Sequence, residues 1–148
     1  MKNKKNIIIL AVLILIVGAV FLFKFRSVQK KYDINSSEVT SINVYDSCNK
    51  VEVKPSEDDK IHVIYHDRKS AEYTINTSGG VLNISNKSKD SNGEVNAGIS
   101  FSSTVLEIKV PKDFKGEFIS TTFDKCEVDK SINFSKVDSK SMSDMLGM

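Results

Sequence analysis

Beyond residue 38, apolar side chains recur at every second position in short runs, which is the pattern of strands with one buried face. The clearest run is Leu106-Glu107-Ile108-Lys109-Val110. Most run centres lie about 8–12 residues apart, with turn formers such as Gly79-Gly80 between them. This spacing predicts an all-β domain over residues 39–135, organised as a sandwich, roll or solenoid. The other runs are Ile42–Val44, Val51–Val53, Ile61–Tyr65, Tyr73–Ile75, Leu82–Ile84, Phe118–Ile119, Cys126–Val128 and Ile132–Phe134.

A different pattern precedes these strands: residues 7–23 form an uninterrupted apolar run. As a helix these 17 residues would span about 26 Å, close to the hydrocarbon thickness of a bilayer. A buried soluble helix would need more surrounding protein than the rest of the chain supplies. Bulky and charged residues follow the run, which favours an uncleaved anchor over a cleavable signal peptide. We therefore predict a cytoplasmic tail over 1–6, a transmembrane signal anchor over 7–23 and a juxtamembrane tether over 24–38.

The charges divide the chain in the same way. Residues 1–31 carry seven basic residues and no acidic one, so residues 32–148 carry the other 14 basic and all 19 acidic residues. The overall charge of +2 is therefore no indication of nucleic-acid binding. Because a short basic tail is easily retained in the cytoplasm, we expect a single-pass protein with a cytoplasmic amino terminus and an extracytoplasmic β domain, whose first partner is the lipid bilayer around residues 7–23.

Two polar stretches lack the strand pattern. Residues 85–98 are rich in Gly, Asn and Ser and are expected to form a loop, the most variable contact region of the domain. Residues 136–148 have neither caps nor a sustained period, so we expect a frayed carboxyl-terminal tail.

Candidate chemistry is sparse. On a strand, His62 and His66 would share a face but lie roughly 13 Å apart, too far to share a zinc ion. The acidic run 57–59 could offer oxygen ligands to calcium but lacks the spacing of a calcium loop, so a solvated turn is favoured. No motif for nucleophilic catalysis, phosphate binding or zinc binding occurs in the sequence. We expect a non-enzymatic protein with no catalytic, cofactor-binding or metal-binding residues.

Cys48 and Cys126 are the two cysteines. Outside the cell they could form a disulfide closing a long loop, which would add about 4 kcal/mol of stability in the chain-entropy model. Nothing in the sequence brings them together, so two unpaired thiols are the favoured reading and the disulfide is the alternative.

The anchor, the first Ile-x-Val strand, the short V-x-V strands and the segment Leu106–Phe114 together resemble the bacterial putative-adhesin family of β-strand-repeat domains, a family of unknown function. The resemblance implies a β-solenoid-like or rolled β-sheet domain of the cell envelope without catalytic residues. Members usually continue with further repeats, whereas this chain stops after two more short strands, so it is either a minimal or a truncated member. A short solenoid is expected to be marginally stable or to self-associate.

Two functions follow as hypotheses. The first is an adhesin-like binding or scaffold module of the bacterial cell envelope, because exposed strand edges are templates for strand addition. The alternative is an accessory or sensor component of an envelope-stress regulatory system, acting on a membrane-protein partner that the sequence does not identify.

Overall fold

A computed structural model of the protein describes residues 2–24, 28–46, 50–67, 71–88, 104–145 and 147. The apolar amino-terminal segment forms one helix, α1 (Lys2–Lys24), and the rest is mostly strand. Two short helical turns, η1 (Ser36–Glu38) and α2 (Met142–Met145), flank strands. The strands are β1 (Val28–Asn35), β2 (Ser41–Asp46), β3 (Lys50–Ser56), β4 (Lys60–Asp67), β5 (Ala71–Ser78), β6 (Val81–Ser88), β7 (Val105–Pro111), β8 (Glu117–Thr122), β9 (Cys126–Val128) and β10 (Lys136–Ser141).

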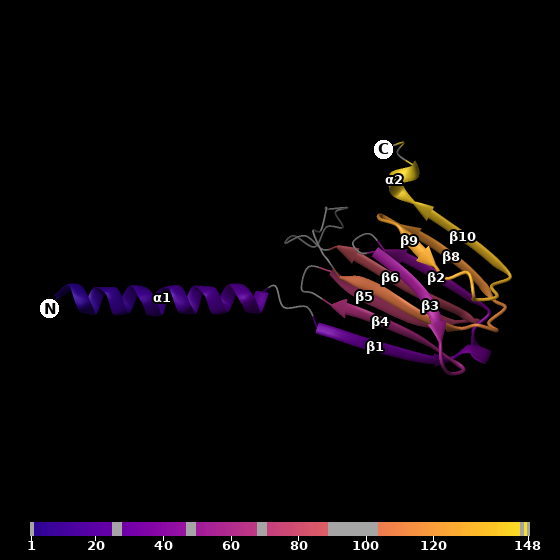
Figure 1. The fold of residues 1–148 in the computed structure, drawn as a ribbon, viewed down its shortest axis with the longest axis horizontal. Coiled ribbons are helices and arrows are strands. Elements are labelled where there is room, and N and C mark those ends of the chain that lie inside the picture. The colour runs from indigo at the N-terminus through magenta and orange to yellow at the C-terminus, as the bar shows by residue number, and fades with distance from the viewer. Residues whose placement is uncertain are drawn as a thin grey trace.

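The strands form two five-stranded sheets that enclose one core (Figure 1). Sheet A has the order β1-β4-β7-β3-β9 and sheet B the order β10-β8-β2-β6-β5. The chain repeatedly crosses from sheet B to sheet A, as from β2 to β3 and from β8 to β9, so strands of successive turns pair in parallel. The pairs β1–β4, β4–β7 and β5–β6 are antiparallel. The result is an open, solenoid-like roll.

The pairing directions place every connection at one of two ends of the roll. Strand β1 begins at the end where β2, β4, β6, β8 and β10 finish, and we call this the proximal end. The opposite end, which we call the distal end, carries the turns at 36–40, 57–59, 79–80, 112–116 and 129–135.

Alternation of side chains builds the core. In β7, Leu106, Ile108 and Val110 are fully buried, whereas Glu107 and Lys109 between them lie on the outer face of sheet A. Fifteen described hydrophobic residues are buried, and all but Val39, Phe114 and Ile132 lie on strands. Most of them are Val or Ile, whose branched side chains suit a pleated surface. Burial of each such side chain contributes about 1.5–3 kcal/mol, so the alternation is what holds the two sheets together.

Toward the proximal end the inward positions of sheet B become polar. Asn86, Asp46 and Thr122 are direct neighbours on β6, β2 and β8, and each is almost fully buried. The hydroxyl of Tyr73, on β5, donates a hydrogen bond to the Asp46 carboxylate. This partnering allows a carboxylate to remain inside the roll.

The two lateral sides of the roll differ. On the closed side, edge strands β1 and β5 meet, with the Tyr32 hydroxyl 3.5 Å from Oγ1 of Thr77. The rings of Tyr65 and Tyr73 pack beside them with centroids 5.3 Å apart. On the open side the edge strands are β9, with three residues, and β10, with six, and among the described residues no strand of sheet A continues beyond β9.

The broad prediction is confirmed, since the described chain is mostly strand with one amino-terminal apolar helix. The tether predicted over 24–38 is wrong for residues 28–35, which form β1. This strand pairs with β4 along its whole length and turns Tyr32 and Ile34 toward the core. Its apolar side chains are few, but the neighbouring strand supplies a complete set of backbone partners.

The frayed tail predicted over 136–148 is wrong for residues 136–145. Residues 136–141 pair in parallel with β8, and α2 follows them directly. The loop predicted over 85–98 is wrong for residues 85–88, which extend β6 beside β2 and β5, and the remainder lies outside the described residues. Residues 132–134, predicted as strand, instead cross the distal end, where the Asn133 amide donates to the Lys112 carbonyl at 2.9 Å.

Candidate binding site at the distal end

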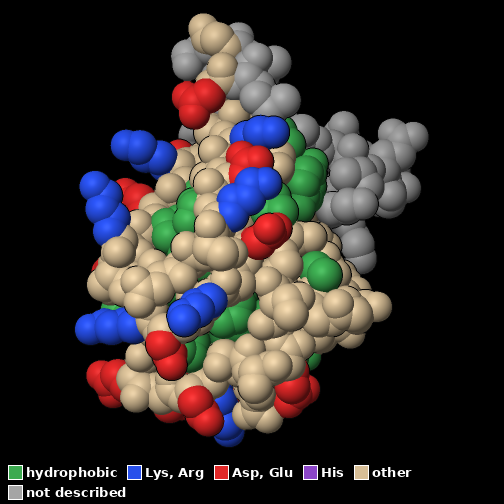
Figure 2. Space-filling model, turned by 90° about the vertical axis from the view of Figure 1, so that its right-hand side faces the viewer, with side chains coloured by type: hydrophobic (Ala, Val, Ile, Leu, Met, Phe, Trp, Pro, Cys, Tyr) green, Lys and Arg blue, Asp and Glu red, His purple; other side chains and the backbone are tan. Residues whose placement is uncertain are grey.

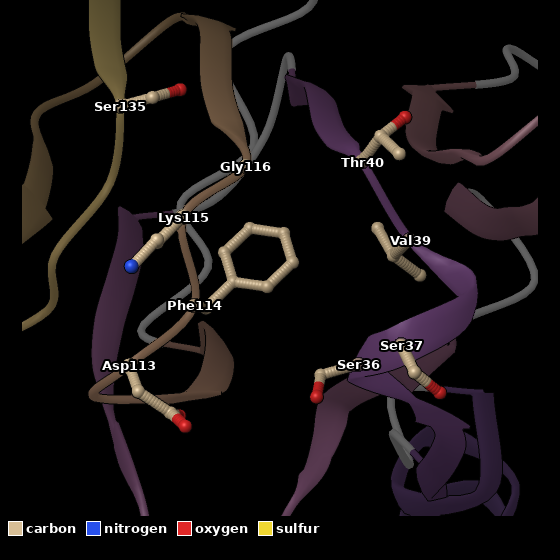
Figure 3. A pocket seen from close by; sticks show the side chains of 9 residues that line it. All are labelled: Ser36, Ser37, Val39, Thr40, Asp113, Phe114, Lys115, Gly116 and Ser135. Carbon is tan, nitrogen blue, oxygen red and sulfur yellow. The ribbon is translucent and has the colours of Figure 1, made fainter.

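A cavity of about 450 Å³ opens between three turns of the distal end, and we call it the distal cavity. Its walls come from the β1–β2 connection, the β7–β8 turn and Ser135, at the end of the β9–β10 turn (Figure 3). The residues that line it are Ser36, Ser37, Val39, Thr40, Asp113, Phe114, Lys115, Gly116 and Ser135.

Backbone hydrogen bonds fix this frame. The Glu117 amide donates to the Thr40 carbonyl at 3.0 Å, and the Ser135 amide donates to the Gly116 carbonyl at 3.1 Å. The Thr40 amide in turn donates to the Gly80 carbonyl at 2.7 Å. Four turns that are distant in the sequence are therefore bonded to one another, so the cavity has a defined shape.

The cavity has an apolar floor and a polar rim. Phe114 and Val39 are nearly buried and point toward each other across it, while the Lys115 amine points away from them (Figure 3). The hydroxyls of Ser37 and Ser135 on the rim make no hydrogen bond to any other described residue. These groups can donate to and accept from a bound molecule, and the floor can contact its apolar part, which is the composition of a binding surface.

The distal end carries charges of both signs. Figure 2 looks onto this end and shows basic and acidic side chains interspersed, with small hydrophobic areas between them. On the outer face of sheet A the charges pair with one another, as Lys54 does with Glu107 at 2.8 Å and with Glu52 at 2.9 Å. These hydrogen bonds raise the pKa of Lys54 above its usual range. Such paired charges leave no field of one sign to attract a strongly charged polymer.

The two histidines do not converge on one site. Nδ1 of His62 lies 2.6 Å from a carboxylate oxygen of Asp33 on β1, and its Nε2 lies 2.8 Å from that of Asp58 in the β3–β4 turn. His66, further along β4, lies opposite Gln29. Within the described part of the chain no group of three or more His, Cys, Asp or Glu residues is arranged to hold a metal ion.

Asp58, which the sequence offered as a calcium ligand, instead organises its own turn. Its carboxylate accepts hydrogen bonds from the Ser56 hydroxyl at 2.7 Å and from the Lys60 amide at 3.0 Å, besides contacting His62. These bonds lower the pKa of Asp58 to about 2, and the bond from Ser56 has the largest effect. The hydrogen bond from His62 is the main reason that the pKa of Asp33 is also lowered. His62 thus connects edge strand β1 to the β3–β4 turn.

These shifts predict how stability depends on pH. A carboxyl whose pKa is lower in the folded than in the unfolded chain stabilises the fold above its ordinary pKa and loses that contribution as pH falls through the folded value. We expect Asp58→Asn to lower the thermal midpoint at pH 7, with the difference from the wild type shrinking between about pH 4 and pH 2. Thermal denaturation at several pH values measures this.

Asp59→Asn is the matched control, because that neighbouring carboxylate makes no hydrogen bond or ion pair with any described residue. A difference between Asp58→Asn and wild type that stayed constant down to pH 2 would show that Asp58 does not stabilise the fold through its charge.

Cys126 lies at the start of β9 and forms no disulfide with a described residue. Cys48 lies outside the described residues, so the favoured prediction of two unpaired thiols and the alternative of a disulfide both stay predictions. Burial is the main reason that the pKa of Cys126 is raised. In a Cys48→Ser chain we therefore expect the folded protein to react more slowly with a thiol reagent at pH 8 than the same chain in urea, since the thiolate is the reactive form. Equal rates in the two conditions would contradict the burial of Cys126.

The model of the Toastrack DUF4097 family matches residues 39–143, well over half of the chain. The chain belongs to this family. The resemblance to adhesin-like β-repeat domains predicted from the sequence is thereby confirmed, and no curated protein matches the chain.

Two solved structures are similar to this Toastrack DUF4097 chain. One is a putative cell adhesion protein from Clostridium sporogenes, with 11% identity and a TM-score of 0.52 over 77% of this chain. This chain spans only 57% of the length of that protein. The other is a putative adhesin from Parabacteroides merdae, with 11% identity and a TM-score of 0.34 over 69% of this chain and 40% of the other. The likeness to the Clostridium sporogenes protein shows that it and this chain share a fold.

Sequence reasoning missed the distal cavity. Its walls come from segments centred near residues 38, 114 and 135, and no motif links them. The sequence offers only two weak indications of this cavity. Gly116 follows Pro111 closely, and the Ser36-Ser37 pair precedes β2, the first strand within the family match. Both mark turns, but only the parallel register of β2 and β8 brings the turns together.

Proposed function

We propose that this chain is a non-enzymatic, adhesin-like binding module that α1 anchors in the cell membrane, with the roll outside the cytoplasm and the distal end turned outward. The family and the adhesion-related name of its structural neighbour support the binding role. The polar rim and apolar floor of the distal cavity support the choice of contact surface.

The observation that carries the proposal is the junction between helix and roll. Helix α1 ends at Lys24 and β1 begins at Val28, so their Cα atoms lie no more than about 14 Å apart. Within α1, residues 3–21 are long and apolar enough to cross a membrane and none of them is buried against the roll (Figure 1). A roll attached so closely has its proximal end at the headgroups, because β1 begins there.

It follows that the distal end is the part of the roll that reaches farthest from the bilayer. Strands of eight residues at about 3.3 Å per residue separate the two ends by about 26 Å. The contact region expected from sequence is residues 85–98. Its described part, residues 85–88, is the proximal end of β6. The proposal therefore moves the expected contact from that loop to the distal cavity.

Labelling of single cysteines in intact bacteria tests this proposal. In a full chain with both native cysteines changed to serine, Ser135→Cys places a thiol on the distal cavity and Lys4→Cys places one before the apolar run. We expect a membrane-impermeant maleimide to label the first variant in intact cells and the second only after permeabilisation.

The reverse labelling pattern, or labelled chain recovered only from the medium without α1, would contradict anchoring in the proposed orientation. Urea-denatured samples of both variants provide the control, because both thiols must then react fully.

A further inference from the structure

We propose that the open side of the roll is a homophilic contact, in which β10 pairs antiparallel with β10 of a second copy in a register centred on Ser139. This inference rests on the proposed function for its membrane geometry, but the strand pairing itself rests on β10 alone.

Strand β10 is the exposed edge best suited to accept another strand. The edge strands of the closed side lie against each other through Tyr32 and Thr77, and β9 has only three residues. By contrast β10 has six residues, and among the described strands it pairs with β8 alone. A free edge of this length presents unpaired amide and carbonyl groups to another strand.

The faces of β10 follow from its register with β8. Val137, Ser139 and Ser141 lie beside the inward-facing Phe118, Ser120 and Thr122 and therefore share the inner face of sheet B. The Ser120 and Ser139 hydroxyls are 2.8 Å apart, in agreement with this placement. Lys136, Asp138 and Lys140 consequently lie on the outer face.

The inner face of β10 is incompletely covered. Val137 is 50% exposed although it faces inward, whereas Ser139 on the same face lies close to Cys126 of β9. Solenoids need their terminal repeats covered. On this side Phe134, just before β10, packs on Phe118 with ring centroids 5.5 Å apart, but Val137 stays half exposed. A second copy aligned along β10 would cover Val137.

Symmetry and charge select the register. In an antiparallel pair directly opposite residues share a face, so a symmetric pair must be centred on one residue. Centring on Ser139 places Asp138 of each copy opposite Lys140 of the other and overlaps residues 137–141. Centring on Asp138 or Lys140 would place like charges opposite each other, which is destabilising.

One other register is electrostatically favourable. Centring on Val137 would pair Lys136 with Asp138, but only residues 136–138 of the strand would overlap. The longer overlap favours Ser139 as the centre. The two registers make different predictions for Lys136 and Lys140, so substitutions separate them.

The membrane geometry makes this a contact between facing surfaces. Strand β10 runs from the distal to the proximal end, so antiparallel pairing places the proximal ends of two copies at opposite ends of the dimer. With α1 attached within about 14 Å of each proximal end, both copies cannot stand in the same bilayer. The second copy must come from an apposed membrane, so the contact is adhesive.

Clustering of vesicles that carry the full chain tests the inference. We expect vesicles of neutral phosphatidylcholine with the wild-type chain to cluster. Asp138→Lys and Lys140→Asp should each abolish clustering, because each places like charges opposite each other twice. Vesicles of the first variant mixed with vesicles of the second should cluster again, since both cross-pairs are then complementary. Lys136→Asp is the matched control and should leave clustering unchanged.

Restored clustering in the mixture also shows that both variants are folded. Persistence of clustering in either single variant, or failure of the mixture, would overturn the proposed register. Loss of clustering in Lys136→Asp but not in Lys140→Asp would select the register centred on Val137 and contradict ours.

Flotation of the same vesicles distinguishes a failure of membrane anchoring from a failure of the homophilic contact. A chain that does not float with the vesicles contradicts the proposed anchoring. A wild-type chain that floats but does not cluster its vesicles contradicts the homophilic contact and leaves the anchored module standing. In detergent, a full chain with Ser139→Cys and serine at both native cysteines should be cross-linked to a dimer by a short bismaleimide, whatever the membrane topology, and absence of the dimer would overturn the pairing.

Discussion

Replacing Gly116 with alanine is expected to lower the free energy of unfolding by about 3 kcal/mol, near the upper end of what overpacking costs. A Cβ at this position would lie 2.5 Å from the Thr40 carbonyl oxygen and 2.4 Å from Cζ of Phe114. The carbonyl cannot move away, because it accepts the hydrogen bond from the Glu117 amide that starts the pairing of β8 with β2. Urea unfolding of the full chain in detergent measures the change.

Lys115→Ala is the control for Gly116→Ala. It changes the neighbouring residue of the same turn, whose side chain is exposed, and should alter stability by no more than about 0.5 kcal/mol. If Gly116→Ala were as stable as this control, the close approach of the β7–β8 turn to β2, and with it the shape of the distal cavity, would be wrong.

The second large effect is expected from Phe118→Ala. Phe118 is fully buried on β8, the strand next to edge strand β10, and packs on the ring of Phe134 with centroids 5.5 Å apart. Its truncation removes the largest fully buried side chain of the roll and leaves a cavity, which costs about 3–5 kcal/mol. We expect this loss of unfolding free energy to remove most of the cooperative unfolding transition that circular dichroism records during a urea titration of the wild-type chain.

Two further variants serve as comparisons for the loss of stability in Phe118→Ala. Phe118→Leu keeps most of the volume and should cost clearly less than the alanine variant. Ile119→Ala alters the next residue, which is half-buried on the outer face, and should cost less than Phe118→Ala. Equal costs for Phe118→Ala and Ile119→Ala would contradict the assignment of faces in β8, on which the faces of β10 also depend.

The core strands could be predicted from the sequence because their side chains alternate. Leu106, Ile108 and Val110 alternate with Glu107 and Lys109, and this pattern alone assigns both a strand and its buried face. The apolar run at 7–23 likewise predicted the centre of α1, which the structure extends to Lys2 and Lys24. In both cases the local pattern and the tertiary environment require the same conformation.

The edge strands could not be predicted in this way. Strand β10 has a single apolar residue, Val137, and its other five residues are charged or carry a hydroxyl, so its sequence gives no alternation to detect. Its conformation comes from backbone pairing with β8, a contact between residues 19 positions apart. Strand β1 follows α1 closely and turns only Tyr32 and Ile34 to the core, so its local sequence resembles that of a tether.

The candidate site depends even more on tertiary structure. Strand geometry predicted that His62 and His66 lie too far apart to share a zinc ion, but it gave no indication of the partners of His62. Asp33 and Asp58 come from β1 and from a distal turn. The distal cavity exists only because the register of β2 with β8 and of β2 with β6 aligns their starting turns. Register is set by the packing of whole sheets, and a single sequence does not display it.

We propose that the roll stands on the bilayer by its proximal end, and quenching by lipid headgroups measures this orientation. A fluorophore is attached to full-length chains in vesicles at Asp124→Cys, in the proximal β8–β9 turn, or at Ser131→Cys, in a distal turn, with serine at both native cysteines. Headgroup-nitroxide lipids should quench the proximal probe strongly and the distal probe, about 26 Å farther away, weakly. Equal quenching at the two sites, or stronger quenching at the distal site, would contradict the proposed orientation of the roll on the bilayer.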